Sequence, residues 1–159
     1  LNNENNPVIK EKSVAWSVVH INHDVIDRIN ILQATLLAMK TAFETLHDNN
    51  FNPINIFELP VSHLVVDGLY VPKFETLPKS ALGNIECVPL VKADGKIPSV
   101  MAASILAKTE RDNLMNEYAK KYPQYEYEKH KGYPTKLHAQ LIRKYGPSPI
   151  QRMTFTVPL

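Results

Sequence analysis

The stretch Leu64-Val65-Val66-Asp67-Gly68 ends a short apolar run on an aspartate that is followed by glycine. A second stretch, Val88-Pro89-Leu90-Val91-Lys92-Ala93-Asp94-Gly95, ends in the same way. In open α/β sheets, ligands gather beyond the carboxyl ends of the strands, so the two carboxylates could share one site. Carboxylate oxygens are the hard ligands that magnesium and manganese prefer. The two stretches therefore indicate an α/β fold with metal-dependent chemistry on a phosphate.

The two aspartates also allow a purely structural interpretation. Aspartate followed by glycine is common in turns, because the side chain accepts hydrogen bonds from nearby backbone groups. Asp94 could simply organise a turn with Gly95. From these residues alone, the structural and the metal-binding interpretations stand level.

Hydrophobic periodicity and breaker residues give the remaining elements. Apolar residues at three- and four-residue spacing predict a helix whose core stripe is Ile29, Leu32, Leu36, Met39, Phe43 and Leu46. Pro98 suits the first turn of a long helix, and Thr135 can cap a final one, which Gly146 and Pro147 terminate. The predicted strands are Ser13–Ile21, Leu64–Val66 and Glu86–Val91; the predicted helices are 29–46, 98–122 and 136–145; Pro72–Gly83 and Tyr122–Pro134 are predicted as connections.

Composition limits the classes of protein to consider. The 159 residues fit one domain, and 44% hydrophobic with 21% charged residues is ordinary for a globular protein. No apolar run approaches the roughly 18 residues of a membrane span. The single cysteine, Cys87, lies in an apolar strand and cannot form an internal disulfide. These features predict a cytoplasmic protein without membrane contact.

The net charge of +2 hides an uneven distribution. The segment from Lys92 to Arg152 holds 12 Lys and Arg against 6 Asp and Glu, so the rest of the chain is acidic. A basic half next to an acidic strand-end site suits a polyanionic substrate held near a metal. On charge alone, a lysine-rich solvated surface is the favoured interpretation.

Longer blocks carry a specific resemblance. The block Asp27-Arg28-Ile29-Asn30-Ile31-Leu32-Gln33-Ala34 and its continuation to Met39 resemble a signature of bacterial ribonuclease HII, the type 2 ribonuclease H. So do Ala102-Ala103-Ser104-Ile105-Leu106-Ala107-Lys108 with its continuation to Asp112, and His130-Lys131-Gly132-Tyr133-Pro134-Thr135. The blocks occur in the family's order, with both aspartate stretches between them, from about Ser13 to Phe155.

This resemblance implies a fold and a reaction. The fold is an α/β, ribonuclease H-like mixed central sheet flanked by helices, with a helical C-terminal portion. The activity is endonucleolytic hydrolysis of the RNA strand of RNA–DNA hybrids, and cutting at ribonucleotides embedded in DNA, by two metal ions, Mg²⁺ or Mn²⁺. The resemblance further implies roles in DNA replication and repair and a monomeric state for the complete protein.

The resemblance also assigns residues. Asp67 and Asp94 match the two later carboxylates of the family's four and are the candidate catalytic and metal-binding residues. Tyr133 matches a tyrosine that packs on the sugar at the RNA–DNA junction, or else it simply anchors its loop. Lys131 and Lys108 are candidate phosphate contacts, or surface charges. Ser104 and Asn30 stand at family positions near the substrate, although capping or local hydrogen bonds explain each almost as well.

The sequence departs from the family at its start. An Asp-Glu pair, a Gly-Arg-Gly loop and a Ser-Lys-Lys segment open the family's domain, and none occurs here. We therefore expect residues 1–159 to be one type 2 ribonuclease H domain, incomplete at its N-terminus and lacking its first strands. We also expect this fragment alone to be inactive. Ala93 replaces the family's usual glycine, and the spacer between Leu46 and Leu64 is longer than usual.

Two alternatives from other classes remain. One is a non-catalytic nucleic-acid-binding remnant of the same fold that uses the basic segment without metal chemistry. Its binding to hybrid would weaken steeply with salt and would be indifferent to changes at Asp67 or Asp94. The other is an unrelated α/β phosphotransfer domain in which Asp67 accepts a phosphate. The blocks around Asn30, Lys108 and Tyr133 count against that alternative.

Overall fold

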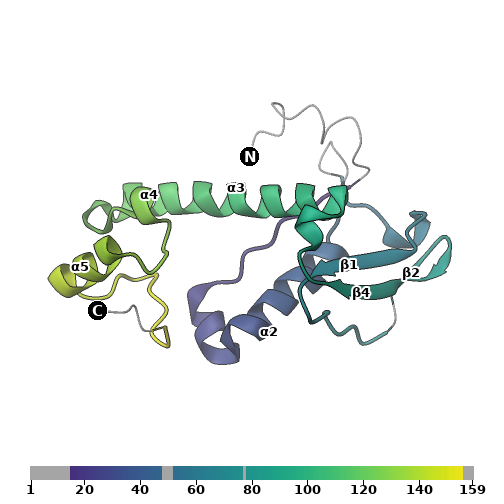
Figure 1. Ribbon diagram of the computed structural model, residues 1–159, viewed down its shortest axis with the longest axis horizontal. Helices are drawn as coiled ribbons and strands as arrows, with labels where there is room; N and C mark the ends of the chain where they lie inside the picture. Colours follow the sequence, from purple (N-terminus) through teal and green to yellow (C-terminus); the bar gives the residue numbers. More distant parts are fainter. Residues whose placement is uncertain (1–14, 48–51, 77, 156–159) are drawn as a thin grey trace. The chain divides into compact units, whose positions relative to one another are not determined.

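The computed structural model describes residues 15–47, 52–76 and 78–155. These residues form two compact units: unit 1 contains residues 20–34 and 108–155, and unit 2 contains residues 15–19 and 35–107. The elements in chain order are α2 (His23–Glu44), η2 (Ile56–Glu58), β1 (His63–Asp67), β2 (Lys79–Ser80), β3 (Gly83–Asn84), β4 (Glu86–Leu90), η3 (Ala93–Gly95), α3 (Pro98–Lys121), η4 (Pro123–Tyr125), α4 (Tyr127–His130) and α5 (Lys136–Tyr145) (Figure 1).

The strands of unit 2 lie in two small pairs. β1 and β4 are parallel, in a register that sets His63 opposite Glu86 and Asp67 opposite Leu90. β2 and β3 form a two-residue antiparallel pair at the end of the segment predicted as a connection, Pro72–Gly83, and extend one residue beyond it to Asn84. Helices together with parallel and antiparallel strands confirm the mixed α/β class. Across the described residues, no helix combines the length and the apolar character needed to cross a membrane.

The first predicted strand is mostly absent. Its residues 13 and 14 lie outside the described part of the chain. From residue 15 to residue 21, Trp16 alone joins a ladder, as an isolated antiparallel bridge to His47 with hydrogen bonds of 2.9 and 3.1 Å. The prediction of a strand over these residues was therefore wrong, apart from the single bridge at Trp16.

The first helix starts earlier than predicted and breaks at Asn30. α2 spans His23–Glu44, but Asn30 has φ 66° and ψ 166°, which no helix contains. The Asn30 side-chain oxygen accepts a hydrogen bond from the Gln33 N–H at 3.1 Å, as an N-cap does. Of the predicted core stripe, Phe43 is buried and packs edge-on against Phe74, whereas Leu32 is exposed.

The core of unit 1 lies partly in the segment Tyr122–Pro134, which was predicted only as a connection. Met115, Tyr125 and Tyr127 form a buried cluster, around which partly buried hydrophobic residues pack. The Tyr125 hydroxyl donates to the Gly146 carbonyl at 3.1 Å, and the Tyr127 hydroxyl is hydrogen-bonded to Ser148. Tyrosines with satisfied hydroxyls are large apolar fillers, which is why a tyrosine-rich segment can form a core.

The last two predicted helices are confirmed. α3 begins at Pro98, as expected for a proline in a first turn, and ends at Lys121. The hydroxyl of Thr135 accepts a hydrogen bond from the His138 N–H at 3.2 Å and so caps α5. Gly146, at φ 80°, ends α5, because this left-handed φ favours glycine.

Candidate functional site

Asp67 and Asp94 come together at one end of the β1–β4 pair in unit 2. Asp67 is the last residue of β1, and its Oδ1 accepts a hydrogen bond from the Ala93 N–H at 3.0 Å. Asp94 follows Ala93 in the short helix η3, and its Oδ1 accepts from the Gly95 N–H at 2.9 Å. Because β1 and β4 are parallel, both carboxylates belong to the carboxyl ends of strands, as the sequence predicted.

A left-handed residue makes this approach possible. Lys92 has φ 58° and ψ 41° and immediately precedes η3. It turns the chain after β4, so that the Ala93 N–H faces the Asp67 carboxylate. Ala93 is fully buried.

The two carboxylates fit a hard divalent cation but supply few ligands. Each uses one oxygen to accept a backbone N–H, and among the described residues no hydrogen bond engages the second oxygen. Both side chains are exposed, so a hydrated ion could reach them. Within the described parts of the chain, no three His, Cys, Asp or Glu side chains are grouped as a metal site. Mg²⁺ keeps several waters and takes one or two protein carboxylates, which this pair could provide.

Three further candidates lie on the helices. Ser104 is exposed on α3, and Lys108 follows it by one turn, where its ammonium pairs with the Asp112 carboxylate at 3.1 Å. Asn30 caps the second segment of α2, so its side-chain oxygen already has a structural partner. The structure thus gives a structural role to Asn30 and a local partner to Lys108.

Lys131 and Tyr133 share the loop between α4 and α5 in unit 1. Lys131 and Gly132 are consecutive left-handed residues, with φ 51° and 77°. This sharp turn leaves Tyr133 52% exposed. The Lys131 ammonium donates to the Asn116 side-chain oxygen, and Arg111 donates to the Lys131 carbonyl at 3.3 Å. The Arg111 guanidinium also lies 6.0 Å from the Tyr133 ring centroid.

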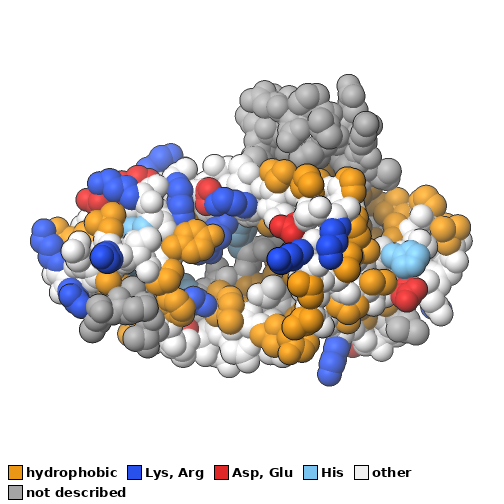
Figure 2. All heavy atoms as spheres, in the orientation of Figure 1, with side chains coloured by type: hydrophobic (Ala, Val, Ile, Leu, Met, Phe, Trp, Pro, Cys, Tyr) orange, Lys and Arg blue, Asp and Glu red, His pale blue; other side chains and the backbone are white. Residues whose placement is uncertain are grey.

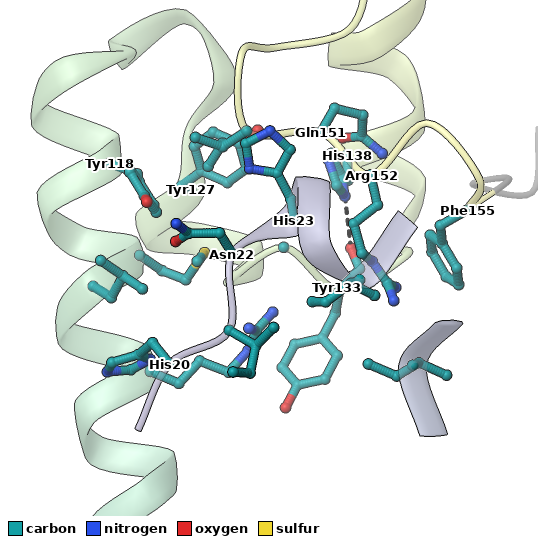
Figure 3. A pocket seen from close by; sticks show the side chains of 18 of the residues that line it. His20, Asn22, His23, Tyr118, Tyr127, Tyr133, His138, Gln151, Arg152 and Phe155 are labelled. Atoms are coloured by element: carbon teal, nitrogen blue, oxygen red, sulfur yellow. Dashed lines mark hydrogen bonds between the residues drawn. The ribbon is translucent and has the colours of Figure 1, made fainter. Parts of the chain in front are cut away.

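A cavity of about 390 Å³ adjoins this loop within unit 1. Figure 3 shows Tyr133, His138 and Arg152 at its wall, with a dashed line from His138 to the Tyr133 backbone. Ionisable, amide and aromatic groups line much of it, including His20, Asn22, His23, Arg111, Tyr118, Tyr127, Gln151 and Phe155. Of these residues, only Tyr133 was a candidate site residue from the sequence, because the wall combines four separate segments of the chain.

The carboxylate of Asp27 attaches the C-terminal segment to this wall. It accepts the Met153 N–H at 2.7 Å, the Thr154 N–H at 3.3 Å and the Thr154 hydroxyl. These hydrogen bonds, that of the Thr154 side chain above all, hold the pKa of Asp27 below its usual value. The Arg152 guanidinium then lies 4.4 Å from the Phe155 ring centroid.

Basic side chains cover the exposed parts of unit 1. Figure 2 shows Lys and Arg gathered over α4, α5 and the second half of α3. Some of these are paired locally: Lys120 with Glu117, and Lys129 with Glu126, each at 2.6 Å. The exposed members of the group include Arg111, Lys120, Lys121, Lys129, Lys136, Arg143 and Lys144.

Comparison with known proteins identifies the relatives of this chain. The family model of ribonuclease HII matches residues 6–157. A ribonuclease HII of Parabacteroides distasonis is 41% identical over 151 residues, which are 95% of this chain and 66% of that relative. A ribonuclease HII of Treponema denticola is 43% identical over 152 residues, covering 94% of this chain and 73% of the relative. A ribonuclease HII of Pelodictyon phaeoclathratiforme is 45% identical over 150 residues, covering 94% and 63%. The chain spans about two thirds of the length of these curated relatives.

Proposed function

The chain belongs to the ribonuclease HII family, and we propose that the protein containing it is an endonuclease acting on RNA–DNA hybrids and on DNA with embedded ribonucleotides. The observation that carries this proposal is the pairing of Asp67 and Asp94 at one strand end, tied by the Asp67–Ala93 hydrogen bond. Family membership supplies the reaction class, and the two carboxylates supply a place for it.

Asp67 and Asp94 are the proposed catalytic and metal-holding residues, and Mg²⁺ or Mn²⁺ are the proposed ions. When bound, such ions would activate a water nucleophile and stabilise the departing 3′ oxygen of the scissile phosphodiester. The backbone N–H groups of Ala93 and Gly95 each hold one carboxylate oxygen, which orients both side chains before any ion arrives. Two carboxylates alone would hold Mg²⁺ weakly, so we expect residues 1–159 by themselves to cut hybrid poorly or not at all.

Tyr133 and the nearby cations are the proposed substrate contacts. An exposed tyrosine ring can pack on a sugar without selecting a base, which suits recognition of a ribonucleotide in any sequence. Lys131 and Lys108 are proposed to contact phosphates. Their present partners, Asn116 and Asp112, hold each ammonium in place until a phosphate competes for it. Ser104 and Asn30 complete the proposed set.

The setting of the reaction is part of the same proposal. We propose a monomeric cytoplasmic enzyme that removes hybrid during DNA replication and ribonucleotides during DNA repair. The basic surface of unit 1 would draw a polyanionic duplex toward the protein, and this attraction would weaken as salt is added.

Substitution of one metal-holding residue tests the proposal. In the full-length protein, Asp94→Asn should reduce cleavage of a hybrid to background while the dissociation constant for that hybrid changes little. Asp24→Asn is a matched control, because Asp24 is an exposed acid that pairs only locally, with Arg28 at 3.4 Å. Wild-type cleavage by Asp94→Asn would refute the assignment. Salt-dependent hybrid binding without cleavage by the unmodified protein would instead support the non-catalytic alternative.

A further inference from the structure

Two buried histidines of unit 1 lie directly behind the Tyr133 loop. His130 ends α4 and His138 lies in the first turn of α5. Their rings stack with centroids 4.2 Å apart and an interplanar angle of 14°. Only 4% of His130 and 3% of His138 is exposed, and Tyr127 contacts both rings edge-on. Neither histidine has a part in the site proposed above.

The backbone partners of His130 determine its tautomer. His130 Nε2 lies 2.8 Å from the Tyr125 carbonyl oxygen. A carbonyl oxygen only accepts hydrogen bonds, so Nε2 carries the proton. The Gly132 N–H donates to His130 Nδ1 at 3.1 Å, so Nδ1 has a lone pair. His130 is therefore a neutral imidazole with its proton on Nε2.

His138 must adopt the opposite tautomer. Its Nδ1 lies 3.0 Å from the Tyr133 carbonyl oxygen, so Nδ1 carries the proton (Figure 3). Burial lowers the pKa of His138. The hydrogen bond with the Tyr133 carbonyl opposes this shift without reversing it. His138 is therefore neutral near pH 7.

The loop contains two left-handed residues in succession. Lys131 has a left-handed φ of 51° although it carries a side chain. Gly132, at φ 77°, cannot become a larger residue without crowding: a Cβ there would meet Arg111 Nη2 at 3.3 Å. His130 Nδ1 accepts the N–H of Gly132, the residue before Tyr133, and His138 Nδ1 donates to the carbonyl of Tyr133 itself. The backbone is thus hydrogen-bonded on both sides of the Tyr133 Cα, while the Tyr133 ring stays exposed.

We propose that His130 and His138 are positioning residues for Tyr133, acting through opposite tautomers that fix the backbone on either side of that tyrosine. This inference rests on the proposed function, since Tyr133 is the proposed sugar contact. The histidines touch no substrate themselves. They set where the tyrosine ring stands before the duplex arrives.

The tautomers can be measured without any substrate. In the full-length protein labelled with ¹⁵N-histidine, NMR at neutral to mildly basic pH distinguishes a protonated ring nitrogen from one with a lone pair. We expect His130 protonated on Nε2 and His138 protonated on Nδ1. The same tautomer on both residues, or an averaged state on either, would overturn the inference whether or not the protein cleaves hybrid.

Isosteric substitutions then test positioning against simple packing. The amide nitrogen of asparagine can replace Nδ1 of histidine, whereas that of glutamine replaces Nε2. His138→Asn should therefore keep the hydrogen bond to the Tyr133 carbonyl, and His138→Gln and His138→Ala should lose it. Because a misplacement of about 1 Å can cost about 100-fold in rate, we expect a loss of that order in kcat/KM for Gln and Ala on a duplex with one ribonucleotide. We expect His138→Asn to keep most of the wild-type kcat/KM.

Tyr125→Phe is the matched control for loss of stability. It removes the hydroxyl bond to the Gly146 carbonyl but leaves the Tyr125 carbonyl that His130 uses. It should lower the melting temperature without changing kcat/KM. Equal activity of His138→Asn and His138→Gln, or an equal loss in Tyr125→Phe, would overturn the inference. If His138→Ala fails to fold, the Asn and Gln pair decides. An unmodified protein that cuts no hybrid would refute the proposed function instead, and the NMR result would still stand.

Discussion

Asp67, the last residue of β1, accepts a hydrogen bond of 3.0 Å from the backbone N–H of Ala93. This bond joins two segments that are 26 residues apart and places Asp94 beside the end of β1. The same carboxylate thus has a structural role and a proposed metal-holding role. Substitutions at Asp67 can separate the two.

Asp67→Asn and Asp67→Ala should differ in stability but not in activity. Asparagine keeps an oxygen that can accept the Ala93 N–H, so the free energy of unfolding should stay within about 0.5 kcal/mol of wild type. Alanine removes the acceptor and should cost about 1 kcal/mol. Both variants should fall to background in hybrid cleavage by the full-length protein. Denaturant titration and a gel assay measure the two properties, and wild-type cleavage by Asp67→Asn would show that the metal-holding role is misassigned.

Thr135→Ala should destabilise the start of α5. Its hydroxyl accepts the His138 N–H at 3.2 Å, and loss of an N-cap typically costs about 1 kcal/mol. Thr135→Ser keeps the hydroxyl and should stay near wild type. Thermal or denaturant unfolding compares the two variants. Equal stability of the alanine and serine variants would mean that the cap contributes nothing.

Stability should fall as the pH drops below 6.5, in part because of His138. Burial lowers the pKa of His138 below 6.5 in the folded protein, so the unfolded chain binds the proton more readily. The loss of unfolding free energy caused by His138 is absent well above pH 6.5. It grows as the pH falls below that value and levels off below the pKa of His138 in the folded protein. His138→Asn cannot titrate, so its unfolding free energy should depend less on pH between about 5 and 7. An unchanged pH dependence in that variant would contradict the assignment.

The hydrogen bonds that Asp27 accepts from Met153 and Thr154, here called the Asp27 clamp, should protect the C-terminal segment from hydrogen exchange. The hydrogen bond from Thr154 above all lowers the pKa of Asp27 below 3.8, so the clamp is fully present above pH 3.8 and is lost as the pH falls through the folded pKa. Asp27→Asn leaves one acceptor oxygen for three donors. We expect faster amide exchange at Met153 and Thr154 in this variant, and no change in Asp24→Asn, since Asp24 lies one turn earlier on α2. Equal exchange in both variants would count against the clamp.

The sequence predicted those features that depend on local chemistry. Pro98 and Thr135 marked helix starts because each acts within one turn of its own position. The strand-end location of Asp67 and Asp94 followed from two short apolar runs, since parallel strands end at the same edge. The break of α2 at Asn30 was harder to predict from the sequence. The apolar stripe continues through it, and only the capping ability of asparagine pointed to a local hydrogen bond.

The features that the sequence missed depend on contacts between distant segments. His130 and His138 are eight residues apart and meet only because α4 and α5 fold back on each other. Nothing in their spacing predicts stacking, and no sequence pattern distinguishes them from the other histidines. The hydrogen bonds that Asp27 accepts from Met153 and Thr154 span more than 120 residues. The tyrosine-rich connection became a core because its hydroxyls find partners in the chain after α5.

The most direct test of the proposed function is to map where the full-length protein cuts a DNA duplex that contains a single ribonucleotide. We expect one cut beside the ribonucleotide, dependent on added Mg²⁺ or Mn²⁺ and absent from an all-DNA duplex of the same sequence. Equal cutting of both duplexes, or no cutting of either while the protein is folded and supplied with metal, would contradict the proposed function.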